Sequence, residues 1–283
     1  MQASSPGSLA SLDGEVMLAS EATIPATDEG LIRGDGVFEV IRLHDGQPFA
    51  FDRHLARMER SARNLRLEVD LEAIRADAWR LLAHAGSSHE DGLLRIVVTR
   101  GGRRLLMTEP MPAAPEIVRL GSVTYAPTRI LDGIKSLSYG PNMLAGRLAR
   151  ERGFDEALLV TPHGRVLEAP TSSIFWVKDG ELLTPPLDEH ILASISRAIV
   201  IEATGAVERS CTLDELTSAD EAFLSSTTRE VRAVRAIDDR TFDAPGPVTA
   251  RTAALVKELV SAQLDAETQQ LDAERRRPAS DTR

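Results

Sequence analysis

Residues 135–160 read KSLSYGPNMLAGRLARERGFDEALLV and place a lysine, an expected helix and an expected strand in immediate succession. This stretch opens with Lys135, continues through a run that reads as a helix, and ends in the apolar strand EALLV. Proline and glycine punctuate the residues just before it, so we expect an interdomain linker over residues 126–134. A side chain at position 135 can then enter a cleft between two domains, which is the default place for a binding site.

The residues before the linker predict a smaller α/β domain over residues 1–125. After a polar leader, the strand pair 36–51 folds into a hairpin because Asp45-Gly46 supplies the turn. Apolar residues at helical spacing and β-branched runs supply the other elements of an α+β unit. The expected strands are 14–19, 36–51, 93–102 and 115–126, and the expected helices are 54–67 and 71–86.

The residues after the linker predict a larger domain over residues 135–283. Hairpin turns are expected at His163-Gly164 and Asp179-Gly180, and a last helix is expected from about Thr249. The tail from about Glu267 is polar, so we expect it to be frayed or disordered. The expected strands are 156–169, 172–185, 221–228 and 231–239, and the other expected helices are 142–153 and 193–205.

Composition narrows the class of protein. A chain of 283 residues exceeds one ordinary core, which favours two domains. Its 33 basic and 43 acidic residues give a net charge of -10, which argues against nucleic acid or an anionic membrane as partner and favours a small molecule. Cys211 is the only cysteine, so no internal disulfide forms, and we read it as a buried small hydrophobe. Without a signal peptide or an apolar run long enough to span a membrane, we expect a cytoplasmic protein.

Lysine is rare in this chain, so any lysine chemistry has three candidates: Lys135, Lys178 and Lys257. The last two read as solvated charges on a hairpin tip and a helix face. From position alone, Lys135 is either functional or another ordinary charge. Residues 193–196 can aim free backbone N–H groups at an anion, or form a plain serine N-cap, and the hydroxyls of 225–228 are equally ambiguous.

Five blocks of sequence carry a more specific signal. They are GLIRGDGVFEVIR (30–42), FDRHLARMERSA (51–62), the stretch 135–160, GRVLEAPTSSIFWVKDGELLTPP (164–186) and EAFLSSTTREV (221–231). In this order they resemble the signature blocks of the class IV (fold type IV) pyridoxal-phosphate enzymes. That family includes branched-chain aminotransferases, D-amino acid transaminases, (R)-selective amine transaminases and aminodeoxychorismate lyase. The resemblance implies two α/β domains with pyridoxal 5'-phosphate at their junction, and a homodimer in which loops of one subunit complete the other's pocket.

The resemblance also implies roles for residues beside the cofactor ring. Lys135 would hold the cofactor as a Schiff base and then shuttle the proton between the substrate α-carbon and the cofactor. A lysine suits both tasks because its pKa falls when it is desolvated or lies beside another cation. Glu168, which alone would read as a surface charge, would keep the pyridine nitrogen protonated. Tyr139 would hydrogen-bond near the phenolic oxygen, and its alternative is a core tyrosine with a satisfied hydroxyl.

The cofactor phosphate is assigned by the same resemblance to four residues. Arg57 matches the family's phosphate-binding arginine, because a guanidinium can bind two oxygens at once. Ile195 and Ser196 match the start of a phosphate-binding helix, and Thr227 matches a threonine that hydrogen-bonds the phosphate. No metal site is predicted.

Substrate recognition is where the sequence departs from the family pattern. Arg33 replaces the aromatic residue that many relatives carry, and it points either into the cleft toward a carboxylate or outward into solvent. Arg103 and Arg104 lie in a loop resembling one that carries a carboxylate-binding arginine in D-amino acid transaminases, but the spacing differs. Thr228 is a further candidate for contact with substrate.

These observations predict a class IV transaminase. It would transfer an amino group from a D-amino acid or (R)-amine, or from a branched-chain L-amino acid, to a 2-keto acid by a ping-pong mechanism. Aminodeoxychorismate lyase, which eliminates pyruvate with the same lysine and cofactor, is the alternative within the family. A non-catalytic protein that keeps the fold for binding is the alternative outside it. The sequence leaves the donor, the acceptor and the enantiomer open.

Overall fold

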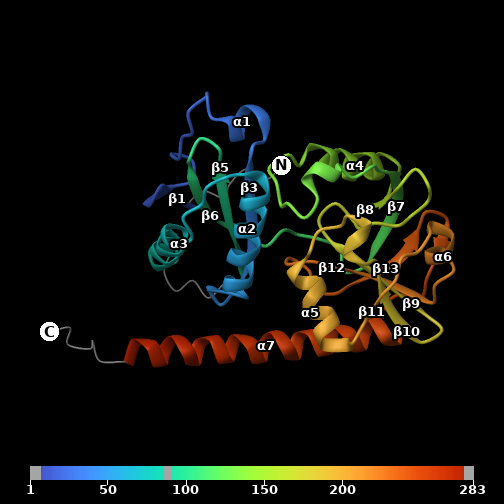
Figure 1. The fold of residues 1–283 in the computed structure, drawn as a ribbon. Helices are drawn as coiled ribbons and strands as arrows, with labels where there is room; N and C mark the ends of the chain where they lie inside the picture. The colour runs from blue at the N-terminus through green and yellow to red at the C-terminus, as the bar shows by residue number, and fades with distance from the viewer. Residues whose placement is uncertain (1–7, 86–90, 277–283) are drawn as a thin grey trace.

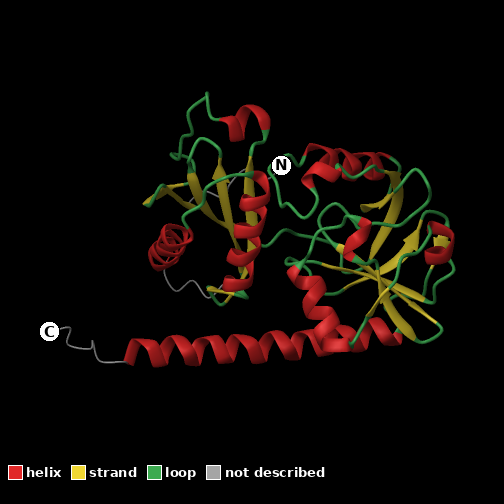
Figure 2. Cartoon of the chain, in the orientation of Figure 1, coloured by secondary structure: helices red, strands yellow, loops and turns green. Residues whose placement is uncertain are grey.

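The computed structural model describes residues 8–85 and 91–276 and arranges them around two β-sheets (Figure 1). Each half mixes strands with helices, and the long last helix runs along one edge of both (Figure 2). The α/β fold class expected from the sequence is therefore confirmed. Among the described residues, no helix is both long enough and apolar enough to cross a bilayer.

The first half contains a six-stranded antiparallel sheet in the order β2-β1-β6-β5-β3-β4. Helices α2 and α3 cover one face of it, since their apolar residues share one core with β3, β5 and β6. The opposite face is left for the cleft. The strands are β1 (Leu9–Leu12), β2 (Glu15–Leu18), β3 (Gly36–His44), β4 (Gln47–Pro48), β5 (Gly92–Thr99) and β6 (Arg104–Pro110), and the helices are α1 (Glu29–Arg33), α2 (Phe51–Leu65) and α3 (Leu71–Ala85).

Local sequence explains most of this half. The predicted hairpin forms at Asp45 and Gly46, whose φ angles of 48° and 79° fit a turn that needs two left-handed residues. Both predicted helices form, although Gly86, the last residue expected in α3, lies outside the described residues. The sequence pattern does not predict β1 or β6, because their buried residues are few and β1 is held by its pairing with β2 and β6.

The second half contains an eight-stranded mixed sheet in the order β11-β10-β9-β12-β13-β7-β8, with β14 beside β13. Its two faces are covered by separate apolar clusters, and Cys211 is buried in one of them, as predicted. The strands are β7 (Val118–Thr124), β8 (Glu156–Val160), β9 (Ser173–Lys178), β10 (Glu181–Thr184), β11 (Val207–Glu208), β12 (Glu221–Ser225), β13 (Arg232–Ile237) and β14 (Arg240–Thr241). The helices are η1 (Arg129–Leu131), α4 (Gly140–Glu151), η2 (Leu187–Glu189), α5 (Ile195–Thr204), α6 (Leu213–Thr217) and α7 (Pro247–Arg276).

Strand β7 corrects one expectation. The sequence assigns residues 115–126 to the first sheet, but β7 pairs in parallel with β8 and β13 of the second. Its buried residues Val118 and Leu120 belong to the second core. The expectation is wrong because an apolar β-branched run shows that a strand forms but not which sheet it joins. The second sheet therefore begins before residue 125, where the predicted first domain ends.

Helix α7 corrects the expectation for the tail. It begins at Pro247, where the Glu221 carboxylate accepts hydrogen bonds from the amides of Val248 and Thr249 at 3.0 and 2.7 Å. It continues to Arg276, although we expected fraying from Glu267. Residues 262–276 are rich in Ala, Gln, Leu, Glu and Arg, which favour a helix even where the surface is polar. The last part of the predicted tail, residues 277–283, lies outside the described residues.

Candidate active site

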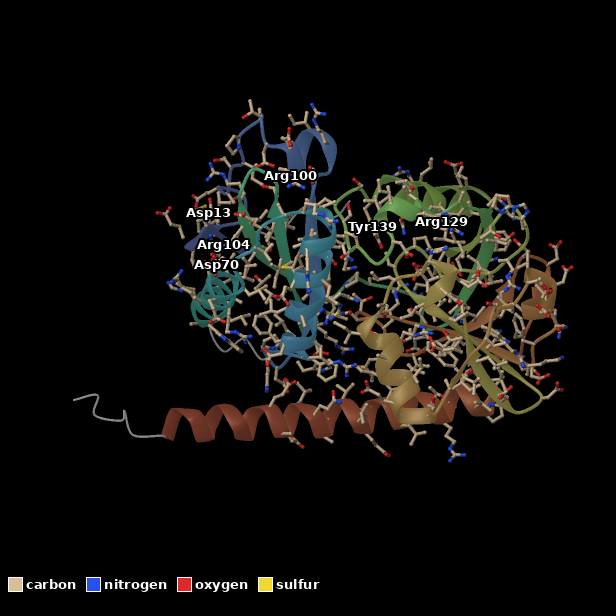
Figure 3. The ribbon with its side chains drawn as sticks, viewed as in Figure 1. Asp13, Asp70, Arg100, Arg104, Arg129 and Tyr139 are labelled. Atoms are coloured by element: carbon tan, nitrogen blue, oxygen red, sulfur yellow. The ribbon has the colours of Figure 1, made fainter. Side chains whose placement is uncertain are left out.

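A cavity of about 1210 Å³ lies between the two halves. Figure 3 marks the place with Tyr139, which lies where the halves meet. Six of the predicted site residues line this cavity: Arg57, Lys135, Tyr139, Glu168, Thr227 and Thr228. Ile195 and Ser196 line a smaller pocket that also includes Thr227. The structure therefore brings together every residue that the sequence assigns to the cofactor.

Lys135 is placed by a short ladder beside β3. The amide of Phe38 donates to the Lys135 carbonyl at 3.1 Å, and the amide of Leu137 donates to the Gly36 carbonyl at 2.9 Å. Position 36 must be glycine, because a Cβ there would lie 2.4 Å from the Val98 carbonyl oxygen and 2.6 Å from a Leu137 methyl. The crossover after the linker thus extends the first sheet and points Lys135 into the cavity.

The surroundings of Lys135 favour its neutral form. Burial is the main cause that lowers the pKa of Lys135 to about 8, and the charge of the Arg57 guanidinium is the second. Its Nζ lies 4.4 Å from the centre of the Phe38 ring and 5.9 Å from that of Tyr139. An amine with this pKa is partly unprotonated at neutral pH, so it can act as a nucleophile and as a base.

Glu168 and Tyr139 lie on the second-domain side of the cavity. Burial raises the pKa of the Glu168 carboxyl to about 7, although the Leu192 amide donates to it at 3.2 Å. A carboxyl group of this kind is stabilised as a carboxylate when a cation comes to lie beside it. Burial, followed by the charge of Glu168, raises the pKa of Tyr139 well above its usual value. Its hydroxyl donates to the Pro170 carbonyl.

Arg57 belongs to a buried network that the sequence analysis does not predict. Glu39 on β3 has no exposed surface and accepts from Arg57 Nε at 2.8 Å and Nη2 at 2.6 Å. His54 Nδ1 lies 2.8 Å from the same carboxylate. Burial alone would raise the pKa of Glu39, but Arg57 and His54 outweigh it and lower that pKa to about 2. The spacing of His54 and Arg57 on one helix, opposite an acidic residue in a strand, is the signal that could have revealed the network.

The start of α5 lines the smaller pocket through Ile195 and Ser196. Ser194 is its N-cap and accepts from the Arg197 amide at 3.2 Å, while the first backbone N–H groups of a helix have no partner within it. Arg57 Nη1 donates to the Ala193 carbonyl at 3.2 Å, which joins the first half to this helix start. A guanidinium, a helix start and the hydroxyls of Ser196 and Thr227 together suit a phosphate group.

Arg33 does not reach the cavity of its own chain. It lies at the end of α1 with 72 % of its side chain exposed, and it forms a long ion pair with Glu29 at 3.9 Å. Of the two alternatives left by the sequence, the structure shows the outward orientation.

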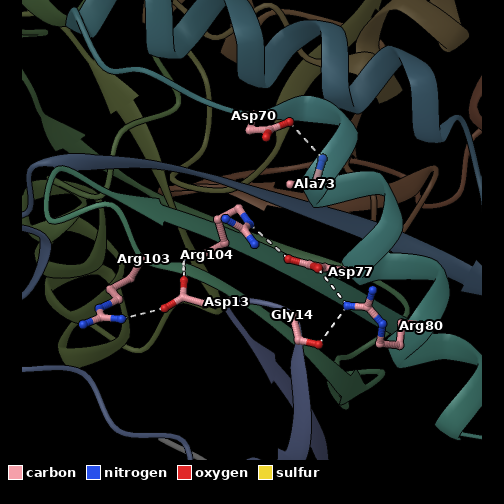
Figure 4. A network of polar contacts seen from close by, with 8 residues as sticks. All are labelled: Asp13, Gly14, Asp70, Ala73, Asp77, Arg80, Arg103 and Arg104. Carbon is pink, nitrogen blue, oxygen red and sulfur yellow. Dashed lines mark hydrogen bonds and ion pairs between the residues drawn. The ribbon is translucent and has the colours of Figure 1, made fainter.

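Arg103, in the turn after β5, and Arg104, the first residue of β6, also lie away from the cavity and form a separate polar network (Figure 4). Arg103 Nη1 donates to Asp13 at 2.7 Å, and Arg104 Nε donates to Asp77 at 3.0 Å. Neither arginine reaches the cavity of its own chain, because they are bound instead to Asp13, which follows β1, and to Asp77 on α3. Resemblance of a loop could not reveal these two aspartates.

A lysine amine of lowered pKa next to an anion-binding helix start defines a class of enzymes that hold a phosphorylated cofactor through that lysine. The family model described as "Amino-transferase class IV" matches residues 36–237, and the chain belongs to this family.

Three curated relatives share most of this chain. It is 34% identical over 252 residues to a "Putative branched-chain-amino-acid aminotransferase" of Methanocaldococcus jannaschii, covering 81% of this chain and 88% of that one. It is 30% identical over 260 residues to the "D-alanine aminotransferase" of Bacillus licheniformis, covering 84% and 92%. It is 30% identical over 240 residues to a "Bifunctional aminodeoxychorismate lyase / D-amino acid transaminase" of Mycobacterium tuberculosis, covering 74% and 82%.

A solved structure has the same fold. The PLP-bound form of "a hypothetical aminotransferase from Mycobacterium tuberculosis" superposes with a TM-score of 0.82 at 26% identity, covering 90% of this chain and 99% of that one. The two-sheet architecture is therefore that of fold type IV.

Proposed function

We propose that this class IV aminotransferase transfers an amino group from a D-amino acid, an (R)-amine or a branched-chain L-amino acid to a 2-keto acid by a ping-pong mechanism. Its cofactor is pyridoxal 5'-phosphate. The observation that carries the proposal is Lys135, a lysine with a pKa lowered to about 8, which faces a cavity also lined by Glu168 and Arg57. The cavity has room for a cofactor and a small substrate together.

The residues of the cavity fit this cofactor. Among the described residues, the side-chain oxygens of Ser172, Ser173 and Ser225 are buried without a hydrogen-bond partner. Ser172 and Ser173 line the large cavity, and Ser225 lines the smaller one. Buried hydroxyls are rarely left unpaired in a folded protein, so these three indicate a polar ligand. Arg57, Ile195, Ser196 and Thr227 would hold the phosphate, and Glu168 would lie against the protonated ring nitrogen.

The chemistry divides between the cofactor and the chain. When bound, the cofactor withdraws the negative charge that remains on the substrate α-carbon after its proton is removed. Lys135 takes that proton and returns it, which its lowered pKa permits near neutral pH. Glu168 holds a proton on the ring nitrogen. Tyr139 and Phe38, whose ring centres lie 5.3 Å apart, together limit the space on one side of the Lys135 amine.

We also propose that the enzyme is a homodimer. Large apolar side chains are exposed on η1 and on α1 and α4, the last two of which both lie along the upper side of the molecule in Figure 1. Exposed apolar residues that gather in this way favour association with another protein surface. They are Leu31, Ile32, Ile130, Met143, Leu144 and Leu148. A cytoplasmic location remains part of the proposal on the grounds given by the sequence.

The relatives favour two groups of donors. Their names include D-alanine and branched-chain aminotransferases, so both D-amino acids and branched-chain L-amino acids are candidates. The bifunctional relative keeps aminodeoxychorismate lyase as a second candidate function. Pyruvate released from aminodeoxychorismate without any keto acid would identify the lyase.

The proposal is tested by a half-reaction screen. Purified holoenzyme is mixed with D- and L-amino acids and with (R)- and (S)-amines, and the loss of the cofactor's visible absorbance is followed. We expect one donor class to react, and borohydride followed by peptide mapping to find the cofactor on Lys135. Lys135→Ala should remove both signals, whereas the matched Lys178→Ala should retain them. A tag on Lys178 or Lys257, or a protein that stays colourless with added cofactor, would contradict the proposal and favour a non-catalytic binding protein.

A further inference from the structure

The first sheet forms one wall of the cavity, and this wall is mostly apolar. The side chains that face the cavity alternate along β3, β5 and β6, as the register of the three strands requires. One pair of charges, Arg95 and Glu109, interrupts them. The apolar residues of this wall are Phe38, Val40, Leu93, Val97 and Met107.

Arg95 and Glu109 are bound to each other within the wall. Arg95 Nε donates to Glu109 Oε1 at 2.5 Å, and Nη2 donates to Oε2 at 2.9 Å. The two side chains retain 31 % and 29 % of their exposure, so they border the cavity rather than the protein core. Glu109 lies opposite Leu93 in the ladder, and Arg95 lies opposite Met107, so the pair is a diagonal contact between neighbouring strands.

The charge of Arg95 is therefore balanced before any substrate arrives. The same holds for the other arginines that line the cavity in the described part of the chain: Arg57 is paired with Glu39, and Arg229 with Glu156 at 2.6 Å. Arg57 lies on α2 and Arg229 follows β12, whereas Arg95 lies on β5 within the apolar wall. The charge of Arg95 also helps to lower the pKa of Lys135, which places it within electrostatic reach of the reacting amine.

We propose that Glu109 determines the side-chain specificity of this enzyme by occupying Arg95. Glu109 takes the hydrogen bonds of Arg95 Nε and Nη2 and balances the guanidinium charge. The wall then accepts apolar or uncharged side chains and disfavours a second carboxylate, which would be repelled by the charge of Glu109. An unpaired arginine in this place would bind that carboxylate through two parallel hydrogen bonds. The inference rests on the proposed function and names its substrate class: amino and keto acids with a single carboxylate, or amines with none.

The test compares two ligands of equal length, glutarate with two carboxylates and pentanoate with one. Their binding to the holoenzyme is measured by calorimetry for wild type, Glu109→Gln and the double variant Arg95→Met, Glu109→Met. Glutamine keeps the size of Glu109 but removes its charge. We expect Glu109→Gln to strengthen glutarate binding relative to pentanoate on the order of 10- to 100-fold, because hydrogen bonds to charged groups are of that strength. The double variant, which lacks the guanidinium, should not show this gain.

The outcomes separate this inference from the proposed function, because binding is measured without turnover. An unchanged glutarate-to-pentanoate ratio in Glu109→Gln, or an equal gain in the double variant, would overturn the role of Glu109. Glu109→Ala repeats the test if the glutamine variant does not fold. The half-reaction screen with the same variants should show a matching gain for glutamate over norvaline. If binding shifts as expected but no donor reacts with any variant, the proposed function fails and the specificity of the wall stands.

Discussion

Replacement of Glu39 by glutamine should destabilise the protein and weaken its binding of the cofactor phosphate. Glu39 is fully buried and neutralises Arg57, so Glu39→Gln would leave a buried guanidinium without a counter-charge. Breaking a buried pair in this way costs roughly 3–5 kcal/mol. The pKa gives a similar figure, since its fall from 4.5 to about 2 corresponds to about 3 kcal/mol.

The pH dependence follows from the sign of that shift. The folded pKa of Glu39 lies below the unfolded value, so its contribution is present above pH 4.5 and is lost as the pH falls toward 2. Urea unfolding of the cofactor-free protein at pH 7 should therefore show a lower midpoint for Glu39→Gln, and the difference from wild type should shrink below pH 4.5. Cofactor release, followed by absorbance, should be faster in the variant.

Glu202→Gln is the matched control, because it removes an ion pair to Arg53 on the same helix as Arg57. That pair is exposed, with 37 % and 47 % of the side chains accessible, and exposed pairs contribute under about 1 kcal/mol. If Glu39→Gln lowers the urea midpoint no more than Glu202→Gln does, the Glu39–Arg57 pair does not stabilise the protein as argued.

Two further predictions follow from the site. Gly36→Ala should destabilise the protein by about 1–3 kcal/mol and displace Lys135, because the added Cβ would lie 2.4 Å from the Val98 carbonyl oxygen; Gly140→Ala, with open space around position 140, should not. Urea midpoints and the rate of cofactor attachment would reveal both effects. Glu168→Gln should lower kcat by about 100-fold and yet stabilise the cofactor-free protein at pH 8. The pKa of Glu168 is raised to about 7, so its ionisation in the folded state costs stability as the pH rises through 7. A variant less stable than wild type at pH 8 would contradict this reasoning.

The sequence predicts local features of this protein well. Lys135, Glu168 and the start of α5 belong to short blocks whose order along the chain is distinctive, and the structure brings them together. Pairing between distant segments is less predictable: an apolar run cannot say that β7 joins the second sheet. The positions of the Arg103 and Arg104 side chains likewise depend on ion pairs with Asp13 and Asp77, which are far away in the sequence. Of the residues named for substrate, Arg33, Arg103 and Arg104 lie outside the cavity of their own chain, whereas Thr228 lines it together with residues named for the cofactor.

Helix α7 has a mechanical consequence for the whole molecule. Its Val256 and Val260 share one apolar cluster with Phe49 of the first half and with Phe175 and Phe223 of the second. A helix that packs against both halves resists their rotation relative to each other. Widening of the cleft must therefore bend α7 or break its contacts with one half. Substrate entry should then rely on small local adjustments at the rim, and the two halves should melt in a single cooperative step.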